Sequence, residues 1–149
     1  MINANELRIG NWVKVCYSGK EGWENVQVTG THNDNSIDTT STSKEKYYYE
    51  PVPLTLELLV KCGAKYFISN GITSFDDDDY REGDTHYWDF NIKETSLVDS
   101  HNISLVKWGE QEYFTFQLER GFYRQKIKYL HQLQNLFFCL AGKELTIEL

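Results

Sequence analysis

The most constraining feature of this sequence is an apolar stripe close to its C-terminal end. Between residues 129 and 142 the apolar residues recur at helical spacing, at Leu130, Leu133, Phe137 and Leu140, with Leu136 and Ala141 widening the stripe. Gly142 stands where a left-handed residue closes a helix. A stripe this apolar has to be buried, so we expect the rest of the chain to supply the surface that covers it.

Short segments rich in strand formers, separated by turn residues, make up the first third of the chain. Strands are predicted at Trp12–Tyr17 and at residues 25–30, 36–40 and 47–49. Pro51 and Pro53 are expected to stop the last of them. Four short strands at this spacing predict either an SH3-like small barrel or a curled antiparallel sheet, and the sequence does not separate the two.

A short central helix follows. Thr55 is its expected N-cap and Gly63 its expected C-terminal residue. Helical spacing places Leu56, Leu59 and Val60 on one face, which we expect to be the packed face.

An antiparallel meander is predicted between the two helices. Asn70-Gly71 lies between two apolar runs and predicts a hairpin turn, after which residues 76–84 read as an acidic loop. Further strands are expected at residues 87–93, 103–108, 113–118 and 123–129, and an edge strand at 145–149. The predicted fold is therefore α+β, with the meander packed by the C-terminal helix. Residues 1–149 are expected to form a single compact domain, or a small β lobe at 1–52 and an α+β lobe at 53–149.

The acidic loop is the first place where a metal could bind. An EF-hand register that begins at Asp78 puts Tyr80 at its third position, where an oxygen ligand is needed, and no helix is predicted on either side. Asp84 and His86 share a strand face, but Asp89 lies on the other face. We therefore expect no metal site, and no motif indicates a cofactor.

Motifs of catalysis are missing from the sequence. It has no G-x-S-x-G, no cysteine in an activating setting and no glycine-rich phosphate loop. Cys62 and Cys139 fall within the predicted helices and are expected to be inert core thiols. The polar run His131-Gln132 with Gln134 and Asn135 is expected to satisfy free backbone groups where strand turns into helix, and the alternative is a polar pocket at the start of that helix. The chain is predicted not to be an enzyme.

Net charge, the N-terminal residues and the cysteines indicate which partners and which compartment to expect. The formal net charge is −7, which disfavours nucleic acid as a partner, although Arg124, Lys126 and Lys128 alternate along one predicted strand face. No signal peptide and no run of about 20 apolar residues is present, so no membrane association is expected. Three widely spaced cysteines favour a reducing compartment, and the predicted location is cytoplasmic.

Aromatic residues gather in the first 50 residues. Three consecutive tyrosines cannot share one face of a strand, so either Tyr48 or both Tyr47 and Tyr49 must point outward, unless the loop at residues 41–46 covers them. Exposed Tyr and Trp side chains commonly anchor interfaces. The candidate partner-binding residues are Trp12, Tyr17, Trp23, Tyr47, Tyr48 and Tyr49, and the expected partner is protein, another copy of the chain included.

Three stretches carry a resemblance that spans the chain: residues 3–13, residues 51–55, and residues 129–137 together with Gly142-Lys143-Glu144-Leu145. They resemble a group of short uncharacterised proteins encoded in phage-derived and mobile-element regions of anaerobic gut bacteria. The resemblance implies an intracellular accessory protein of a mobile element and no particular activity. The predicted function is a non-enzymatic accessory module that binds protein or itself.

Two alternatives remain open. An acidic effector would use residues 76–79, Glu82 and Asp84 as phosphate substitutes and occupy a nucleic-acid-binding site on a host protein. A weak nucleic-acid-binding module would use Arg124, Lys126 and Lys128.

Overall fold

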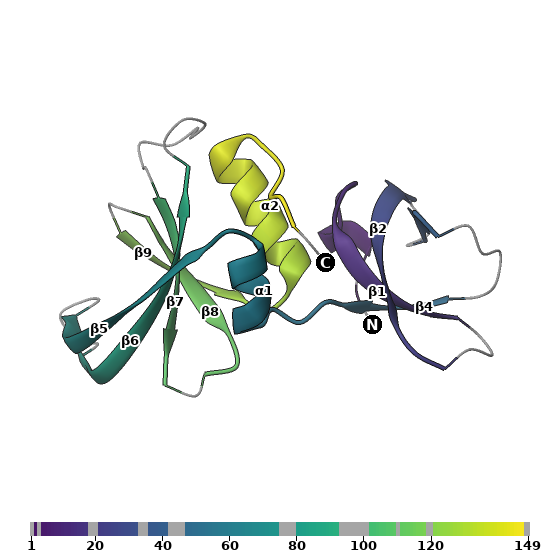
Figure 1. The fold of residues 1–149 in the computed structure, drawn as a ribbon. Helices are drawn as coiled ribbons and strands as arrows, with labels where there is room; N and C mark the ends of the chain where they lie inside the picture. The colour runs from purple at the N-terminus through teal and green to yellow at the C-terminus, as the bar shows by residue number, and fades with distance from the viewer. Residues whose placement is uncertain are drawn as a thin grey trace. The chain divides into compact units, whose positions relative to one another are not determined.

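The computed structural model describes residues 2, 4–17, 21–32, 36–41, 47–74, 80–92, 102–109, 111–118 and 121–147. Figure 1 shows an α+β fold that is mostly strand, with two antiparallel sheets and two α-helices in these ranges. Along the chain the elements are a 3-10 turn η1 (Ala4–Glu6), β1 (Trp12–Tyr17), β2 (Glu24–Thr31), β3 (Ile37–Thr39), β4 (Tyr47–Pro51), α1 (Leu56–Lys61), β5 (Lys65–Ser74), β6 (Tyr80–Asn91), β7 (Asn102–Trp108), β8 (Phe114–Leu118), β9 (Gly121–Ile127) and α2 (Leu130–Ala141).

The chain divides into two compact units. The first contains Met1–Leu54 and Tyr129–Leu136, and the second contains Thr55–Lys128 and Phe137–Glu148. Helix α2 therefore begins in the first unit and ends in the second. That residues 1–149 form a single compact domain, or one lobe at 1–52 and another at 53–149, stays a prediction.

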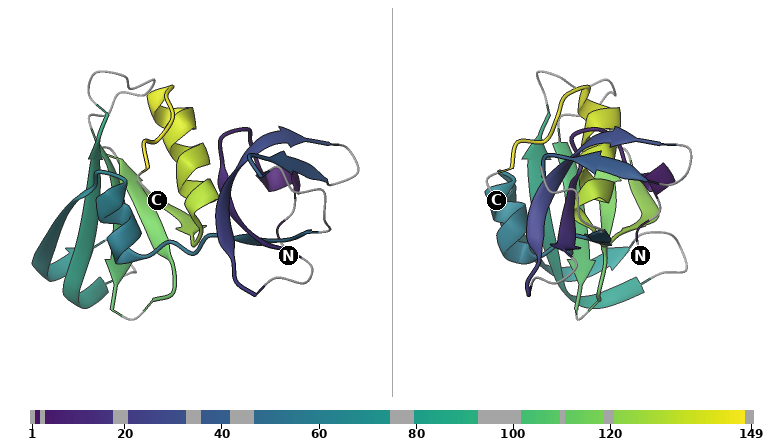
Figure 2. Two further views of the ribbon diagram at one scale, coloured as in Figure 1. Left: turned by 45° about the vertical axis from the view of Figure 1, so that its right-hand side comes forward. Right: turned by 90° about the vertical axis from the view of Figure 1, so that its right-hand side faces the viewer.

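The first unit is built on a four-stranded sheet with the order β3-β2-β1-β4. Its strands alternate as period-two sequences should: Val13, Val15 and Tyr17 are buried, while the residues between them are half-buried. Figure 2 shows that this sheet is curled. The pairings of its described strands leave β3 and β4 as edges, so a closed SH3-like barrel is not found among them.

The second unit contains the predicted meander, in which β5, β6, β7, β8 and β9 pair in sequence order. Registers align Trp88, Leu105 and Phe116 across three neighbouring strands, and all three side chains are buried. From α2, the ring of Phe137 meets Phe90 edge-on at 6.0 Å between centroids. The buried face of this sheet and the last turns of α2 thus supply the core of the unit.

The predicted turn at Asn70-Gly71 is wrong. Both residues lie inside β5, where Asn70 pairs with Asp84 and Gly71 with Gly83. Pairing of β5 with β6 is continuous from Lys65 to Ser74, so the local turn signal is overridden by a ladder of backbone hydrogen bonds. Residues 80–84, predicted as part of an acidic loop, begin β6 instead, and residues 75–79 lie outside the described ranges.

The central helix has the predicted ends but a different packed face. Thr55 Oγ1 accepts a hydrogen bond from the Leu58 amide at 3.2 Å, and Gly63 follows the helix with φ +83°. Leu58, Leu59 and Cys62 are buried. The expected face was wrong for two residues because a six-residue helix fits two overlapping apolar stripes, and Leu56 and Val60 are the ones left exposed, at 48% and 59%.

The C-terminal helix and its closing glycine are confirmed. The Gly142 amide donates to the Phe138 carbonyl at 2.9 Å, and Gly142 has φ +68°. Two details were wrong: Cys139 is exposed rather than a core thiol, and residues 145–147 form no strand. Burial raises the pKa of the Cys62 thiol to about 11, which agrees with the inert role predicted for that residue.

Candidate functional site

The aromatic residues singled out in the sequence do not gather on one surface. Trp23 and Tyr48 are exposed at 46% and 64%, whereas Trp12 is half-buried. Tyr17 is buried, with its hydroxyl bonded to Glu24 and Ser41. Tyr49 packs partly against the core of the first unit.

The strand register explains this division. Tyr49 lies opposite the buried Val15, and Tyr48 lies opposite Cys16 on the other face of the sheet. Tyr47 belongs to β4, but its side chain lies outside the described residues. The structure therefore leaves Trp23 and Tyr48 as the well-exposed members of the set whose side chains are described.

Within the first unit, polar side chains of α2 hold the N-terminal segment. Gln134, only 2% exposed, accepts a hydrogen bond from the Trp12 amide at 2.9 Å and donates to the Gly10 carbonyl at 3.1 Å. Asn135 donates to the Glu6 carbonyl at 2.9 Å. The prediction that the amides of this run satisfy backbone groups is confirmed, but the partners of Gln134 and Asn135 are far away in the sequence, and only Gln132 acts at the strand-to-helix junction.

The start of α2 is fixed by two further interactions. Gln132 Oε1 accepts a hydrogen bond from the Tyr129 amide at 3.2 Å, which resembles half of a capping box. The Leu130 amide donates to the Val52 carbonyl at 2.9 Å, and Pro53 forms an antiparallel bridge with Tyr129. These contacts bring the segment after β4 against the first turn of α2.

His131 is the exception in this polar run. It is 1% exposed, and neither ring nitrogen has a hydrogen-bond partner. The nearest carboxylate is that of Glu6, whose Oε2 lies 3.7 Å from His131 Nε2, too far for a good hydrogen bond. Burial lowers the pKa of His131, and the negative charge of Glu6 opposes that shift. The ring is therefore neutral at pH 7.

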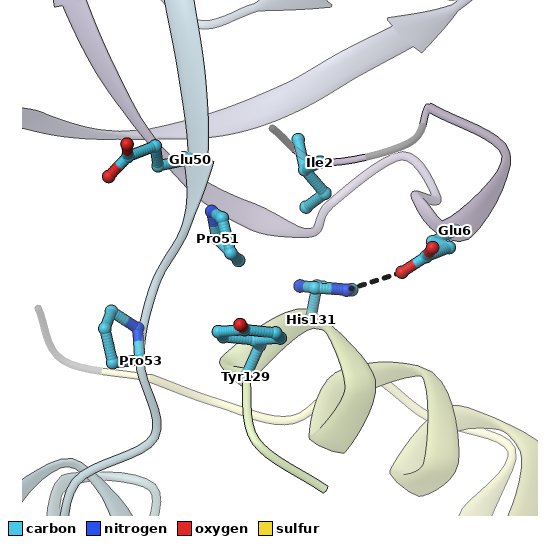
Figure 3. A pocket seen from close by; sticks show the side chains of 7 residues that line it. All are labelled: Ile2, Glu6, Glu50, Pro51, Pro53, Tyr129 and His131. Carbon is cyan, nitrogen blue, oxygen red and sulfur yellow. Dashed lines mark ion pairs between the residues drawn. The ribbon is translucent and has the colours of Figure 1, made fainter.

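A hollow of about 470 Å³ opens at this histidine, as Figure 3 shows. The His131 ring stacks on Tyr129, with 5.9 Å between centroids and 10° between planes. One edge of the ring faces Glu6, and Glu50 and Pro51 of β4 lie across the hollow. Its full lining is Ile2, Glu6, Glu50, Pro51, Pro53, Tyr129 and His131, all of which belong to the first unit.

Edge strand β5 carries a second unusual surface, in the second unit. Tyr66, Phe67 and Ile68 are consecutive and exposed at 52%, 44% and 43%. The ring of Phe67 stacks on that of Tyr87 with 4.7 Å between the centroids, and the Tyr66 hydroxyl lies 2.8 Å from His86 Nδ1. In the described sheet β5 pairs with β6 alone, so its other side is an open edge.

The exposed edge at β5 was not predicted from the sequence, and a polar pocket at the start of α2 was only the alternative to a capping role. A turn at Asn70-Gly71 would make residues 65–69 one arm of a short hairpin. Instead they belong to the long edge strand β5. The hollow joins Glu6, Pro51 and His131 from distant parts of the chain, so no local spacing signals it. The one sequence signal was the polar run beginning at His131.

The candidate metal ligands do not come together. Asp84 is exposed, His86 contacts Tyr66, and Asp89 faces the other side of β6, bonded to Ser104. Burial raises the pKa of Asp89 above its usual value, and the Ser104 hydrogen bond opposes part of that shift. Within the described ranges, no three His, Cys, Asp or Glu side chains are placed to hold a metal ion.

Neither α-helix in the described part of the chain has the length and apolar character needed to cross a bilayer. No protein-family model matches the chain, and no curated protein or solved structure is significantly similar to it.

Proposed function

We propose that this protein is a non-enzymatic interaction module and that it pairs with a second copy of itself through β5. The observation that supports this proposal is the run Tyr66-Phe67-Ile68 on an open sheet edge. A mobile-element setting belongs to the same proposal and rests only on the sequence resemblance.

An edge strand presents unpaired backbone N–H and C=O groups that another strand can bind. Because side chains alternate along a strand, Tyr66 and Ile68 point to one face of the sheet and Phe67 to the other. All three are exposed, so an incoming strand would bury apolar surface on both faces while completing backbone hydrogen bonds. Natural proteins normally protect such an edge with charges or prolines, and residues 66–69 contain neither.

A second copy of the chain suits this edge because residues 65–69 can pair with the same residues of that copy without a clash of charges. Antiparallel pairing about a two-fold axis at Phe67 places Tyr66 opposite Ile68 of the other copy and Lys65 opposite Ser69, with no like charges facing. A closed dimer through β5 is thus favoured over an open chain of copies.

Lys126 and Lys128, two of the three basic residues named for nucleic-acid binding, have partners within the protein. Lys126 Nζ lies 4.6 Å from the centre of the Tyr113 ring, and Lys128 Nζ lies 4.0 Å from Glu112 Oε2. These contacts give direct nucleic-acid binding no added support. The carboxylates of residues 76–79, which the acidic-effector alternative needs, lie outside the described ranges.

The test is the mass of the protein in solution, measured by light scattering from micromolar to millimolar concentration. Wild type is expected to shift from monomer to dimer, and Phe67→Lys is expected to remain monomeric because it places two cations opposite each other at the axis. Tyr48→Lys is the matched control, an exposed aromatic of the first unit. Loss of the dimer in Tyr48→Lys alone, or a strict wild-type monomer at millimolar concentration, would contradict pairing through β5.

A further inference from the structure

His131 is a buried side chain with unused hydrogen-bonding capacity that faces an open hollow. A buried polar group without a partner usually costs about 1–3 kcal/mol, so native structures seldom leave one without a reason. Here both ring nitrogens lack a hydrogen-bond partner although the side chain is 1% exposed. The amides of the same helix turns, Gln132, Gln134 and Asn135, all have partners. His131 is therefore the residue here whose polar atoms a ligand would satisfy.

The size and lining of the hollow restrict what that ligand can be. Its volume of about 470 Å³ lies in the range of small-molecule sites and accommodates a group as large as a lysine side chain. Ile2, Pro51 and Pro53 give it apolar walls, and Tyr129 contributes an aromatic ring. An apolar stem with one polar end fits this mixture.

The charges of the lining favour a cation at that polar end. Glu6 and Glu50 are the ionisable carboxyl groups on the hollow, and no Lys or Arg is among its lining residues. An anion would be repelled by both carboxylates, whereas an ammonium group is attracted to them. A neutral His131 ring has one unprotonated nitrogen that accepts a hydrogen bond from an ammonium N–H. A cation can also rest against the face of the Tyr129 ring.

We propose that this hollow binds an alkylammonium group, which donates hydrogen bonds from the hollow to both Glu6 and His131 and lays its stem along Pro51, Pro53 and Tyr129. Such a group occurs at the end of a lysine side chain of a partner protein and in small free amines. Both sources offer the same chemistry, and the experiment below separates them. The proposal does not depend on pairing through β5, which concerns the other unit.

The test titrates three probes into the full chain and follows the ring resonance of His131 by NMR. The probes are lysine capped as its acetyl and methylamide derivative, norleucine capped in the same way, and n-butylammonium. Capped lysine is expected to shift the His131 resonance with saturation and to bind about tenfold more tightly than capped norleucine, which lacks the charge. Binding of n-butylammonium as tight as that of capped lysine identifies a free-amine site. Weaker binding of n-butylammonium identifies a site for a protein side chain.

Two variants place the cation within the hollow. Glu6→Gln keeps the shape of the side chain and leaves intact the backbone carbonyl that Asn135 uses, so the fold should be preserved. It is expected to weaken capped-lysine binding about fivefold. Glu21→Gln removes an exposed carboxylate of the same unit that does not line the hollow, and binding should not change.

Equal shifts by capped lysine and capped norleucine would overturn the proposal, as would equal losses in the two variants. Absence of any shift at millimolar amine would also overturn it and would leave water as the partner of the His131 nitrogens.

Discussion

Burial of His131 couples the stability of the protein to pH. Since burial lowers the pKa of the folded state's imidazole, the unfolded chain takes up a proton first, from about pH 6.5 downward. Stability is therefore complete above that pH and falls as the pH decreases through it. Glu6, Glu50 and Tyr129 are the other ionisable groups on the hollow, and the Glu6 carboxylate reduces the size of the effect.

We predict that His131→Phe, which keeps a ring on Tyr129 but cannot titrate, loses less stability than wild type between about pH 7.5 and pH 5.5. Urea unfolding at the two pH values measures the difference. His32→Gln is the control at an exposed histidine, and it should keep the pH dependence of wild type. If His131→Phe keeps the full pH dependence of wild type, another group is responsible.

Gln134 supports two backbone groups at once. Gln134→Met has a similar length but leaves the Trp12 amide and the Gly10 carbonyl without their partner. We expect the free energy of unfolding to fall by about 2–3 kcal/mol, because buried polar groups lose their hydrogen bonds. Gln132→Met removes the hydrogen bond from the Tyr129 amide at a half-buried position and should cost less, about 1 kcal/mol. Equal losses in the two variants, measured by urea unfolding, would contradict this account.

Among the helices and strands, α1 gives the sharpest test of packing. It contains Leu56 and Leu59, which are 48% and 0% exposed. We predict that Leu59→Ala lowers the free energy of unfolding by about 2–5 kcal/mol, because it opens a cavity in the core. Leu56→Ala makes the same chemical change at an exposed position and should cost less than about 1 kcal/mol. If urea unfolding shows similar losses of stability for Leu56→Ala and Leu59→Ala, Leu56 belongs to the packed face after all, as the sequence predicted.

Elements whose signals are local could be predicted from the sequence. The strand Trp12–Tyr17, the Thr55 cap and the Gly142 helix end each depend on residues within a few positions of one another. The turn predicted at Asn70-Gly71 failed because strand pairing with Asp84 and Gly83 is a tertiary interaction that outweighs the local preference. A six-residue helix is likewise too short for periodicity alone to choose its packed face.

The candidate sites were harder to predict than the elements. Alternation predicted that Tyr48 and Tyr49 part to opposite faces of β4, but not that Tyr17 bonds to Glu24. The hollow needs Glu6 and His131 side by side, and only the folded first unit supplies that arrangement. Exposure of Tyr66 and Phe67 followed from the place of β5 at the edge of its sheet, which no local pattern reveals.

At the scale of the whole molecule, helix α2 ties the two units together through its own backbone. Leu130–Leu136 belong to the first unit and Phe137–Ala141 to the second, and both parts carry buried side chains such as Leu133 and Phe137. An isolated helix of about 12 residues is only marginally stable in water. Unfolding of one unit should therefore also destabilise the half of α2 that belongs to the other unit. The continuity of α2 thus favours cooperative unfolding.

We predict one unfolding transition for the whole chain. Trp12 and Trp23 report on the first unit and Trp88 and Trp108 on the second, so fluorotryptophan labelling gives each unit its own ¹⁹F signals. All four native signals should disappear at the same urea concentration. Leu133→Ala, at a fully buried position of the first unit, should lower that concentration for all four, because the loss is transmitted along α2. If Leu133→Ala lowers the urea concentration for the Trp12 and Trp23 signals alone, the units unfold independently, and α2 does not couple them.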